Sequence, residues 1–264
     1  MRLPFFDASA MIGETIPPLP APLPDARSLL DEMDHFGIEQ SLFFHYTMSP
    51  EGPNRMNSLT LQSAKTSERL VPCWILQTTP AMLGEDLDKE AQRIAGSGVK
   101  AARLFPSEGP SASPAPLRTY FIGGILAGLE RYRIPLLIPE ALLNVEQLGS
   151  GAYDPVEQFC AAFPQLPVVI LEPRYNSAPL LMPLLRRYSN LYVTITLFAL
   201  FHQLESMVEM TGAEHFVFGT GLPRLDASIA TGMLLYSSLQ RESLELIAGG
   251  NLRRLLANAG REGQ

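Results

Sequence analysis

The stretch His215–Pro223 reads His-Phe-Val-Phe-Gly-Thr-Gly-Leu-Pro, a short apolar run followed by a tight turn. A continuous apolar run bounded by turn residues is typical of a parallel strand that is buried on both faces. Glycine and proline then end such a strand. The stretch therefore predicts a central strand of a parallel sheet, with a turn at its carboxyl end.

Similar short apolar runs occur along the whole chain, separated by longer amphipathic segments. This alternation predicts βα units arranged around a parallel sheet. The predicted strands are Leu3–Ser9, Gln40–Tyr46, Leu70–Gln77, Lys100–Pro106, Pro135–Ala141, Pro167–Arg174, Leu191–Thr196 and His215–Thr220.

Helical segments follow the strands, the first of them with Asp25 as its expected N-cap and Gly37 at its end. Eight βα units predict a single-domain α/β fold, a (β/α)8 TIM barrel that spans residues 1–264. A doubly wound open sheet is the alternative, and it is disfavoured because no glycine-rich phosphate-binding fingerprint follows the first strand. The predicted helices are Ala26–Phe36, Gly84–Ala95, Arg118–Arg133, Asp154–Ala162, Ala178–Tyr188, Phe201–Met210, Asp226–Leu239 and Glu242–Ala259.

Two stretches rich in proline, serine or glycine interrupt the alternation, Thr15–Pro24 and Ser107–Pro116. Because the βα pattern continues in phase beyond each of them, they are predicted to be loops rather than domain linkers. Both follow strands, so both are expected over the carboxyl end of the barrel, where barrel sites are built. Thr15–Pro24 is interpreted as a stiff lid loop, with a polyproline ligand as the alternative.

Composition limits the classes of function. The chain has 264 residues, is 46% hydrophobic and carries a formal net charge of −7. These values predict a large core, and the lack of a basic run argues against nucleic-acid binding. No apolar run approaches the roughly 20 residues of a membrane span, and the N-terminus lacks a signal-peptide pattern, so a cytoplasmic protein is expected. Cys73 and Cys160 are expected to be buried free thiols.

Six segments carry a family pattern in their order and spacing: Phe6–Gly13, Gly98–Pro106, Ile134–Glu140, Phe163–Glu172, Gly219–Pro223 and Gly250–Leu255. Together they resemble the amidohydrolase superfamily, in the branch related to aminocarboxymuconate decarboxylase. The resemblance spans almost the whole chain. It implies a TIM barrel whose substrates are small carboxylated or cyclic organic compounds, cleaved at C–N, C–O or C–C bonds.

The metal centre of that family is the part that this sequence lacks. Asp7 and Gly13 of the opening motif are kept, but its two histidine positions hold Ser9 and Met11. Serine, methionine, proline and glycine do not supply the imidazole and carboxylate donors that the metal needs. These departures from the family pattern predict that the chain binds no metal, and no other cofactor is expected. The remaining family ligand positions correspond to Pro139, Glu172 and Gly221.

Three side chains at predicted strand ends are candidates for catalysis. His45 could act as a general base near neutral pH, and the alternative is a hydrogen-bonded core or rim histidine. Glu172 could be catalytic, or it could form an ion pair with Arg174 that replaces the lost metal charge. Asp7 could take part in catalysis, or it could only bond the neighbouring strand ends.

Side chains at the same end of the barrel are candidates for binding the substrate. The guanidinium of Arg174 could bind a carboxylate through its planar fork, or could pair with Glu172, because alternate strand residues point the same way. Arg103 is predicted to face inward, and a buried arginine needs an anion, so it is expected to meet Glu172, Asp7 or a ligand. The candidates are Ser9, Arg103, Glu140, Arg174 and Thr196.

Two classes of function remain open. The first is a metal-independent hydrolase or lyase for a small carboxylated or cyclic compound, with His45 as the base and Arg103 or Arg174 holding the carboxylate. The second is a catalytically inactive relative that binds a small molecule or stabilises a partner subunit. The two differ in whether His45 points into a pocket beside Arg103 or packs sideways under a helix. The apolar segment Asp226–Leu239 permits a homodimer.

Overall fold

Eight parallel strands form one sheet in sequential order, β1 to β8, in the computed structural model. The model describes residues 3–15, 18–47, 52–76, 87–104, 117–143, 145 and 149–262. Sequential order confirms the predicted TIM barrel, since a doubly wound sheet reverses its order at a switch point. The strands are β1 Phe5–Ile12, β2 Ile38–His45, β3 Leu70–Ile75, β4 Ala101–Arg103, β5 Leu136–Pro139, β6 Val168–Leu171, β7 Leu191–Thr194 and β8 Phe216–Val217.

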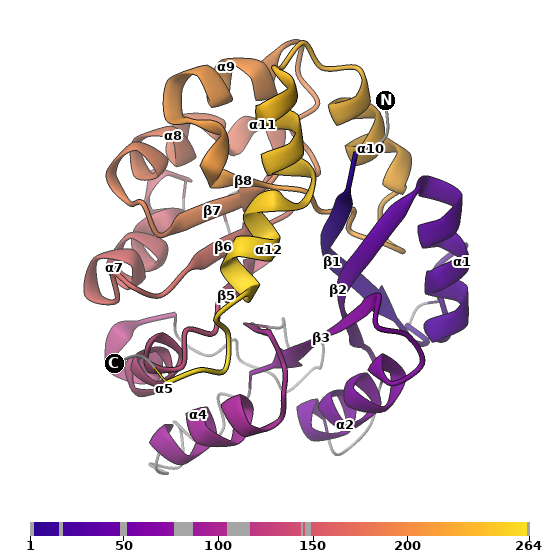
Figure 1. Ribbon diagram of the computed structural model, residues 1–264. Helices are drawn as coiled ribbons and strands as arrows, with labels where there is room; N and C mark the ends of the chain where they lie inside the picture. The colour runs from indigo at the N-terminus through magenta and orange to yellow at the C-terminus, as the bar shows by residue number, and fades with distance from the viewer. Residues whose placement is uncertain are drawn as a thin grey trace.

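Helices surround the ring of strands (Figure 1). Most of them begin and end close to the predicted positions, but α2 has no counterpart among the predicted helices, because serine, threonine and asparagine interrupt its apolar pattern. The predicted last helix is divided by a π-helical turn. The α-helices are α1 Ala26–Phe36, α2 Pro53–Ala64, α4 Leu87–Gly96, α5 Thr119–Arg131, α7 Asp154–Ala162, α8 Ala178–Arg187, α9 Gln203–Thr211, α10 Ala227–Leu235, α11 Arg241–Glu245 and α12 Asn251–Leu256, with a π-helical turn, Leu246–Gly250, joining the last two. Short 3-10 helices occupy Glu140–Leu143, Gly149–Tyr153, Tyr175–Ser177 and Ala213–His215.

The barrel closes between β1 and the segment that follows β8. The backbone N–H of Ala8 donates to the carbonyl of Phe218 at 3.0 Å, and that of Met11 donates to Leu222 at 2.9 Å. In the opposite direction, the Gly221 N–H donates to the carbonyl of Ser9 at 2.9 Å. The turn after β8 is therefore part of the barrel wall.

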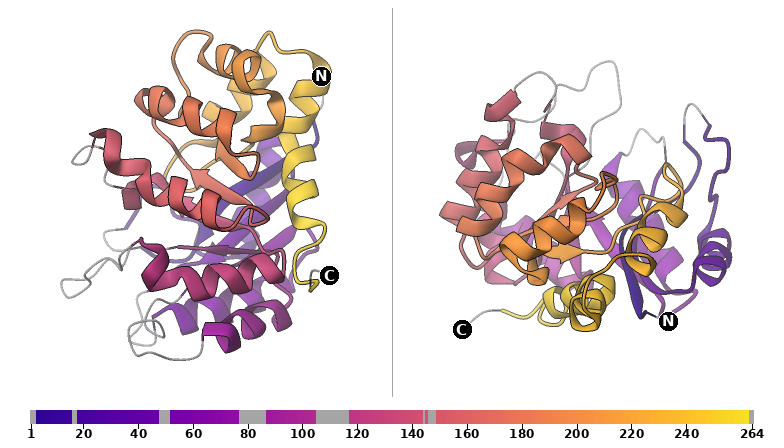
Figure 2. Two further views of the ribbon diagram at one scale, coloured as in Figure 1. Left: turned by 90° about the vertical axis from the view of Figure 1, so that its left-hand side faces the viewer. Right: turned by 90° about the horizontal axis from the view of Figure 1, so that it is seen from above.

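The helix α12 closes the end of the barrel where the strands begin (Figure 2). Its Leu252 packs inside the barrel against apolar side chains that include Leu42 and Leu137. The buried amide of Asn251 donates to the carbonyls of Ala213 and Phe216, each at 2.8 Å. The segment Gly250–Leu255 therefore closes this end of the barrel. A binding site is expected at the opposite end, where the strands end.

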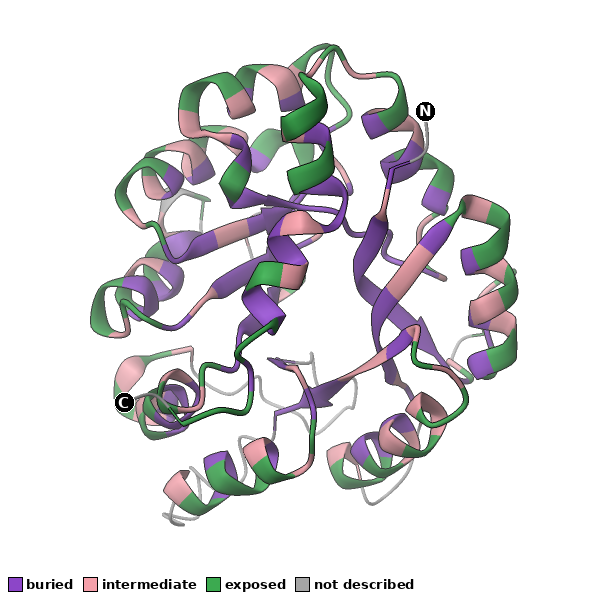
Figure 3. Ribbon diagram, viewed as in Figure 1, coloured by how far each residue is buried: buried purple, intermediate pink, exposed green. Residues whose placement is uncertain are grey.

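Burial follows the barrel architecture, with the strands buried and the outward faces of the helices exposed (Figure 3). Cys73 and Cys160 are buried free thiols, as predicted, and burial raises the pKa of each to about 12. Ile229 and Leu235 of α10 are exposed apolar residues, and the homodimer remains a prediction. Within the described ranges, no helix combines the length and hydropathy of a membrane span.

The two predicted loops have different outcomes. Thr15–Pro24 is described apart from residues 16 and 17, and its Leu19 packs against the cluster of Met11, Phe44 and Tyr46 at the carboxyl end of the barrel. This position confirms a loop over that end. Residues 107–116 lie outside the described residues.

Candidate functional site

Four side chains meet at the carboxyl end of the barrel, and we refer to them as the mouth cluster: Ser9, Arg103, Glu172 and Arg224. The Ser9 hydroxyl donates to Oε1 of Glu172 at 2.9 Å and accepts from Nη1 of Arg103 at 3.5 Å. Arg224 forms an ion pair with the other oxygen of Glu172. The cluster thus joins β1 and β4 to the segments that follow β6 and β8.

Arg103 lies deep in the barrel, with 5% of its surface exposed. Its guanidinium carbon lies 4.6 Å from the centroid of the Phe44 ring, a cation–π contact. Burial lowers the pKa of Arg103, and the negative charge of Glu172 opposes that shift. Its Nε–H has no hydrogen-bond partner among the residues that the structure describes. A buried guanidinium with a free donor is costly, and this cost favours an anion at the mouth.

Glu172 does not continue the strand. β6 ends at Leu171, three residues before the predicted end at Arg174, and Glu172 takes a left-handed backbone conformation with φ 55°. Its N–H donates to the Thr194 hydroxyl at 2.7 Å. The alternation expected to place Glu172 and Arg174 on one face is therefore absent. Non-glycine residues rarely adopt this conformation, and such residues are concentrated at functional sites.

The four residues of the mouth cluster carry an excess of positive charge, and the buried carboxyl of Asp7 beside them partly offsets the charge of Arg103. It holds two guanidinium groups and one carboxylate, and that carboxylate is only 12% exposed. The Arg103 guanidinium contacts Glu172 through the Ser9 hydroxyl rather than directly. A singly charged anion beside Arg103 would balance the cluster.

Asp7 is fully buried and fully hydrogen-bonded. Its Oδ1 accepts from the N–H of Ser9 at 3.0 Å and of Thr220 at 2.8 Å. Its Oδ2 accepts from the hydroxyls of Thr220 at 2.7 Å and Ser41 at 3.3 Å. Burial raises the pKa of Asp7, and these hydrogen bonds oppose the shift. A carboxylate offers about four acceptor sites, so Asp7 holds β1, β2 and the turn after β8 together.

His45 lies against α2. Its Nδ1 is 3.2 Å from the hydroxyl of Ser63, and its backbone N–H donates to the hydroxyl of Thr60 at 2.8 Å, both on that helix. The preceding residue, Phe44, contacts Arg103 instead. His45 thus fits the alternative of a hydrogen-bonded rim histidine, and the structure does not bring it together with Arg103.

The placement of His45 gives a pH-dependent stability. Burial lowers its pKa below the ordinary 6.5, and the positive charge of Arg55 lowers it further. The unfolded chain therefore binds a proton more readily, so stability falls as pH decreases through 6.5 toward the folded pKa. We expect His45→Gln to reduce this loss, measured by urea unfolding at about pH 7.5 and 5. The variant of the exposed His35, His35→Gln, should keep the wild-type pH dependence.

The other candidates have structural partners. One oxygen of Glu140 accepts from the backbone N–H of Arg174 at 3.0 Å, and the other accepts from the Tyr153 hydroxyl. Thr196 donates to the carbonyl of Gly219 at 2.8 Å. The side chain of Arg174 is exposed. Among the described residues, Glu140 and Thr196 form no hydrogen bond with a member of the mouth cluster.

Arg224 and Phe44 are the members of the site that the sequence analysis does not identify. Arg224 directly follows the Leu-Pro turn that ends His215–Pro223, so its position past a strand end is the available signal. Phe44 offers no such signal, because it resembles any core residue. Its role depends on the position of Arg103 across the barrel.

The donors at the family's ligand positions do not fit a metal of the family type. Met11 lies in an apolar cluster with Phe44 and Ile75, and Glu172 is already paired. Gly221, which has no side-chain donor, takes a left-handed backbone conformation with φ 74°. Within the described ranges, no three histidine, cysteine, aspartate or glutamate side chains are grouped to hold a metal ion.

Comparison with known proteins finds similarity at the level of structure. No family model matches the sequence, and no curated protein matches it. A 2,6-dihydroxybenzoate decarboxylase from Rhizobium superposes with a TM-score of 0.75 at 16% identity, over 97% of this chain and 99% of that one. A dihydroxybenzoic acid decarboxylase from Polaromonas, with bound manganese and the inhibitor 2-nitroresorcinol, has a TM-score of 0.72 at 15% identity over 97% of both chains.

An amidohydrolase II structure also superposes, with a TM-score of 0.69 at 14% identity, over 96% of this chain and 99% of that one. These neighbours agree with the resemblance that the six sequence segments carry. At these identities the similarity establishes the fold. The chain has the TIM-barrel fold that these three structures share.

Proposed function

We propose that the mouth of this barrel binds a small organic carboxylate, with Arg103 as the residue that receives the carboxylate group. The observation that carries the proposal is the buried guanidinium of Arg103, 5% exposed and with a free Nε–H within the described part of the chain. Guanidinium and carboxylate groups match in a planar, two-bond geometry. The structural neighbours support this class of ligand, because two of them are decarboxylases of dihydroxybenzoic acids.

The proposal includes the replacement of the family's metal by fixed positive charge. In the Polaromonas neighbour a manganese ion is bound. Here Ser9 and Met11 occupy the opening ligand positions, and Arg103 contacts Ser9. An arginine keeps its charge at all physiological pH values and needs no donor ligands. We therefore infer a binding site that works without a metal.

The preferred function is binding rather than catalysis, because the described residues place no free base at the mouth. Asp7 has all of its acceptor sites filled, and His45 bonds to α2. Glu172 is held by Ser9 and Arg224. The chain then serves as a small-molecule-binding relative of the decarboxylase-like barrels.

A second candidate is a metal-independent lyase or hydrolase. The observation that favours it is the 2.9 Å hydrogen bond between Ser9 and Glu172, together with the left-handed backbone of Glu172. A substrate carboxylate that draws Arg224 away would free Glu172 to exchange a proton. Release of carbon dioxide from dihydroxybenzoates by the wild type, but not by Glu172→Gln, would favour this candidate over binding alone.

Calorimetric titration with benzoate and with benzamide tests the proposed function. The two ligands have nearly the same shape and differ in charge. We expect benzoate to bind and benzamide to bind at least about tenfold more weakly, because a charge-assisted pair at a buried site contributes roughly 1.5–3 kcal/mol. Equal affinities would contradict a site that recognises the carboxylate.

A further inference from the structure

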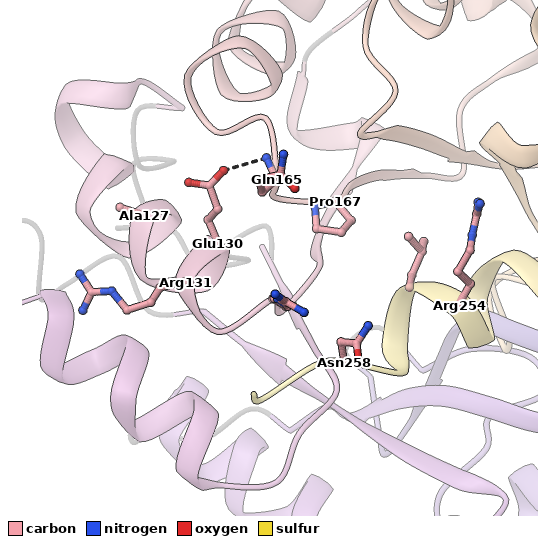
Figure 4. Close-up of a pocket in the computed structure, with 9 residues that line it drawn as sticks. Ala127, Glu130, Arg131, Gln165, Pro167, Arg254 and Asn258 are labelled. Carbon is pink, nitrogen blue, oxygen red and sulfur yellow. Dashed lines mark hydrogen bonds between the residues drawn. The ribbon is translucent and has the colours of Figure 1, made fainter. Parts of the chain in front are cut away.

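A pocket of about 780 Å³ lies at the opposite end of the barrel, where the strands begin (Figure 4). α5, the segment that precedes β6 and the C-terminal segment with α12 form its walls. Its apolar lining comes from Ala127, Pro167 and Leu255, and its polar lining includes three arginines and two side-chain amides. The mouth cluster contributes no residue to it, so the two sites are separate.

The charges around this pocket are unequal. Arg131, Arg133 and Arg254 line it, and Glu130 is the acidic residue among them. Oε1 of Glu130 accepts from the backbone N–H of Gln165 at 2.8 Å, as the dashed line in Figure 4 shows. The pocket is therefore positive, on a chain whose formal net charge is −7.

Two of the three arginines have partners. Arg131 forms an ion pair with Asp88 at 2.7 Å, and its side chain extends away from the Gln165 side of the pocket (Figure 4). Nη2 of Arg254 donates to the carbonyl of Glu214 at 3.3 Å and to Asn251 at 3.2 Å. The exposed side chain of Arg133 has no hydrogen bond or ion pair with any residue that the structure describes.

Arg133 also stands where glycine is favoured. Its N–H donates to the carbonyl of Glu130 at 3.0 Å, and the N–H of Ile134 donates to Leu129 at 2.9 Å, the pattern that ends a helix with a left-handed residue. Arg133 is that residue, with φ 53°. Glycine takes this conformation without strain. The strained backbone therefore holds a free guanidinium at the rim of a positive pocket.

We propose that this pocket binds a small organic molecule with a phosphate group, and that Arg133 is its main contact. The second positive charge comes from Arg254, and the amides of Gln165 and Asn258 supply further donors. Two guanidinium groups match the charge of a phosphate monoester better than that of a monocarboxylate. The apolar walls fit the organic part of the ligand.

Phenyl phosphate tests the proposal, with binding followed by calorimetric titration and thermal unfolding. We expect Arg133→Gly to weaken binding about tenfold or more, because one charge-assisted contact is lost. Glycine also relieves the strained backbone, so the Tm of the free variant should rise by about 2–4 °C. The loss of binding then cannot result from misfolding.

Two control variants make the result decisive. Arg131→Gln removes the same charge from the pocket wall, and its affinity for phenyl phosphate should stay close to the wild-type value. Arg103→Met removes the charge at the mouth and should leave this affinity unchanged. The proposal is overturned if phenyl phosphate does not bind the wild type, if it binds Arg133→Gly equally well, or if binding is lost in Arg103→Met instead.

Discussion

Replacing Arg103 by methionine is expected to weaken benzoate binding about 100-fold, because two charge-assisted hydrogen bonds contribute roughly 3 kcal/mol. The long apolar side chain keeps the contact with Phe44 and fills the same buried space. Glu172 keeps its ion pair with Arg224 in this variant. Replacement of a buried charge by an apolar side chain of similar volume is often neutral for folding, so we expect a folded protein that no longer holds the carboxylate. Calorimetric titration measures the affinity.

Two further variants test whether the effect of Arg103→Met comes from the planar guanidinium group and whether it is specific to this position. Arg103→Lys keeps the charge but lacks the planar fork, so an intermediate affinity is expected. Arg186→Gln removes an exposed positive charge far along α8 and should bind benzoate as the wild type does. Wild-type affinity in Arg103→Met would contradict the proposed role of this residue.

The Asp7→Ala variant is expected to lose about 3–5 kcal/mol of unfolding free energy, since each buried donor left without a partner costs roughly 1–3 kcal/mol. The two N–H groups of Ser9 and Thr220 lose their acceptor, and so do the hydroxyls of Ser41 and Thr220. β1, β2 and the turn after β8 lose their common link. Urea unfolding measures the change.

The Asp7→Asn variant is the matched control. Its amide oxygen can still accept from Ser9 and Thr220, and its NH₂ group can donate to the two hydroxyls, which also act as acceptors. We expect it to lose about 1 kcal/mol or less, since each hydrogen bond is kept in reversed or equal form. An equally small loss in Asp7→Ala would show that the hydrogen bonds of Asp7 do not stabilise the barrel.

The sequence predicts the barrel well because burial on both faces of its strands leaves continuous apolar runs. The strand ends are less predictable. Seven of the predicted strands extend beyond the carboxyl ends that the structure shows, as at β6, where Glu172 leaves the strand although its neighbours are apolar. Hydropathy indicates which residues are buried, but a residue can remain buried after the hydrogen-bonded strand has ended, so hydropathy does not fix the end of a strand. The helix α2 is missed because serine, threonine and asparagine interrupt its apolar pattern.

The mouth cluster is only partly predictable. The inward position of Arg103 follows from its place on β4, and its proximity to Glu172 is among the expected outcomes. The ion pair of Glu172 with Arg224 joins residues 52 positions apart, and no local pattern specifies it. The sequence also does not predict on which side of the barrel wall the His45 side chain lies. A strand that is buried on both faces has no alternation of polar and apolar residues from which this could be inferred.

The measurement that tests the central claim most directly is the metal content of the purified protein. The chain is expressed with added zinc and manganese, desalted and analysed by elemental mass spectrometry. Because arginine takes the place of the metal in this account, we expect both metals far below one equivalent per chain, and benzoate binding that chelators leave unchanged. About one equivalent of either metal, lost in Glu172→Gln together with benzoate binding, would contradict the account and return the family's metal centre to the barrel mouth.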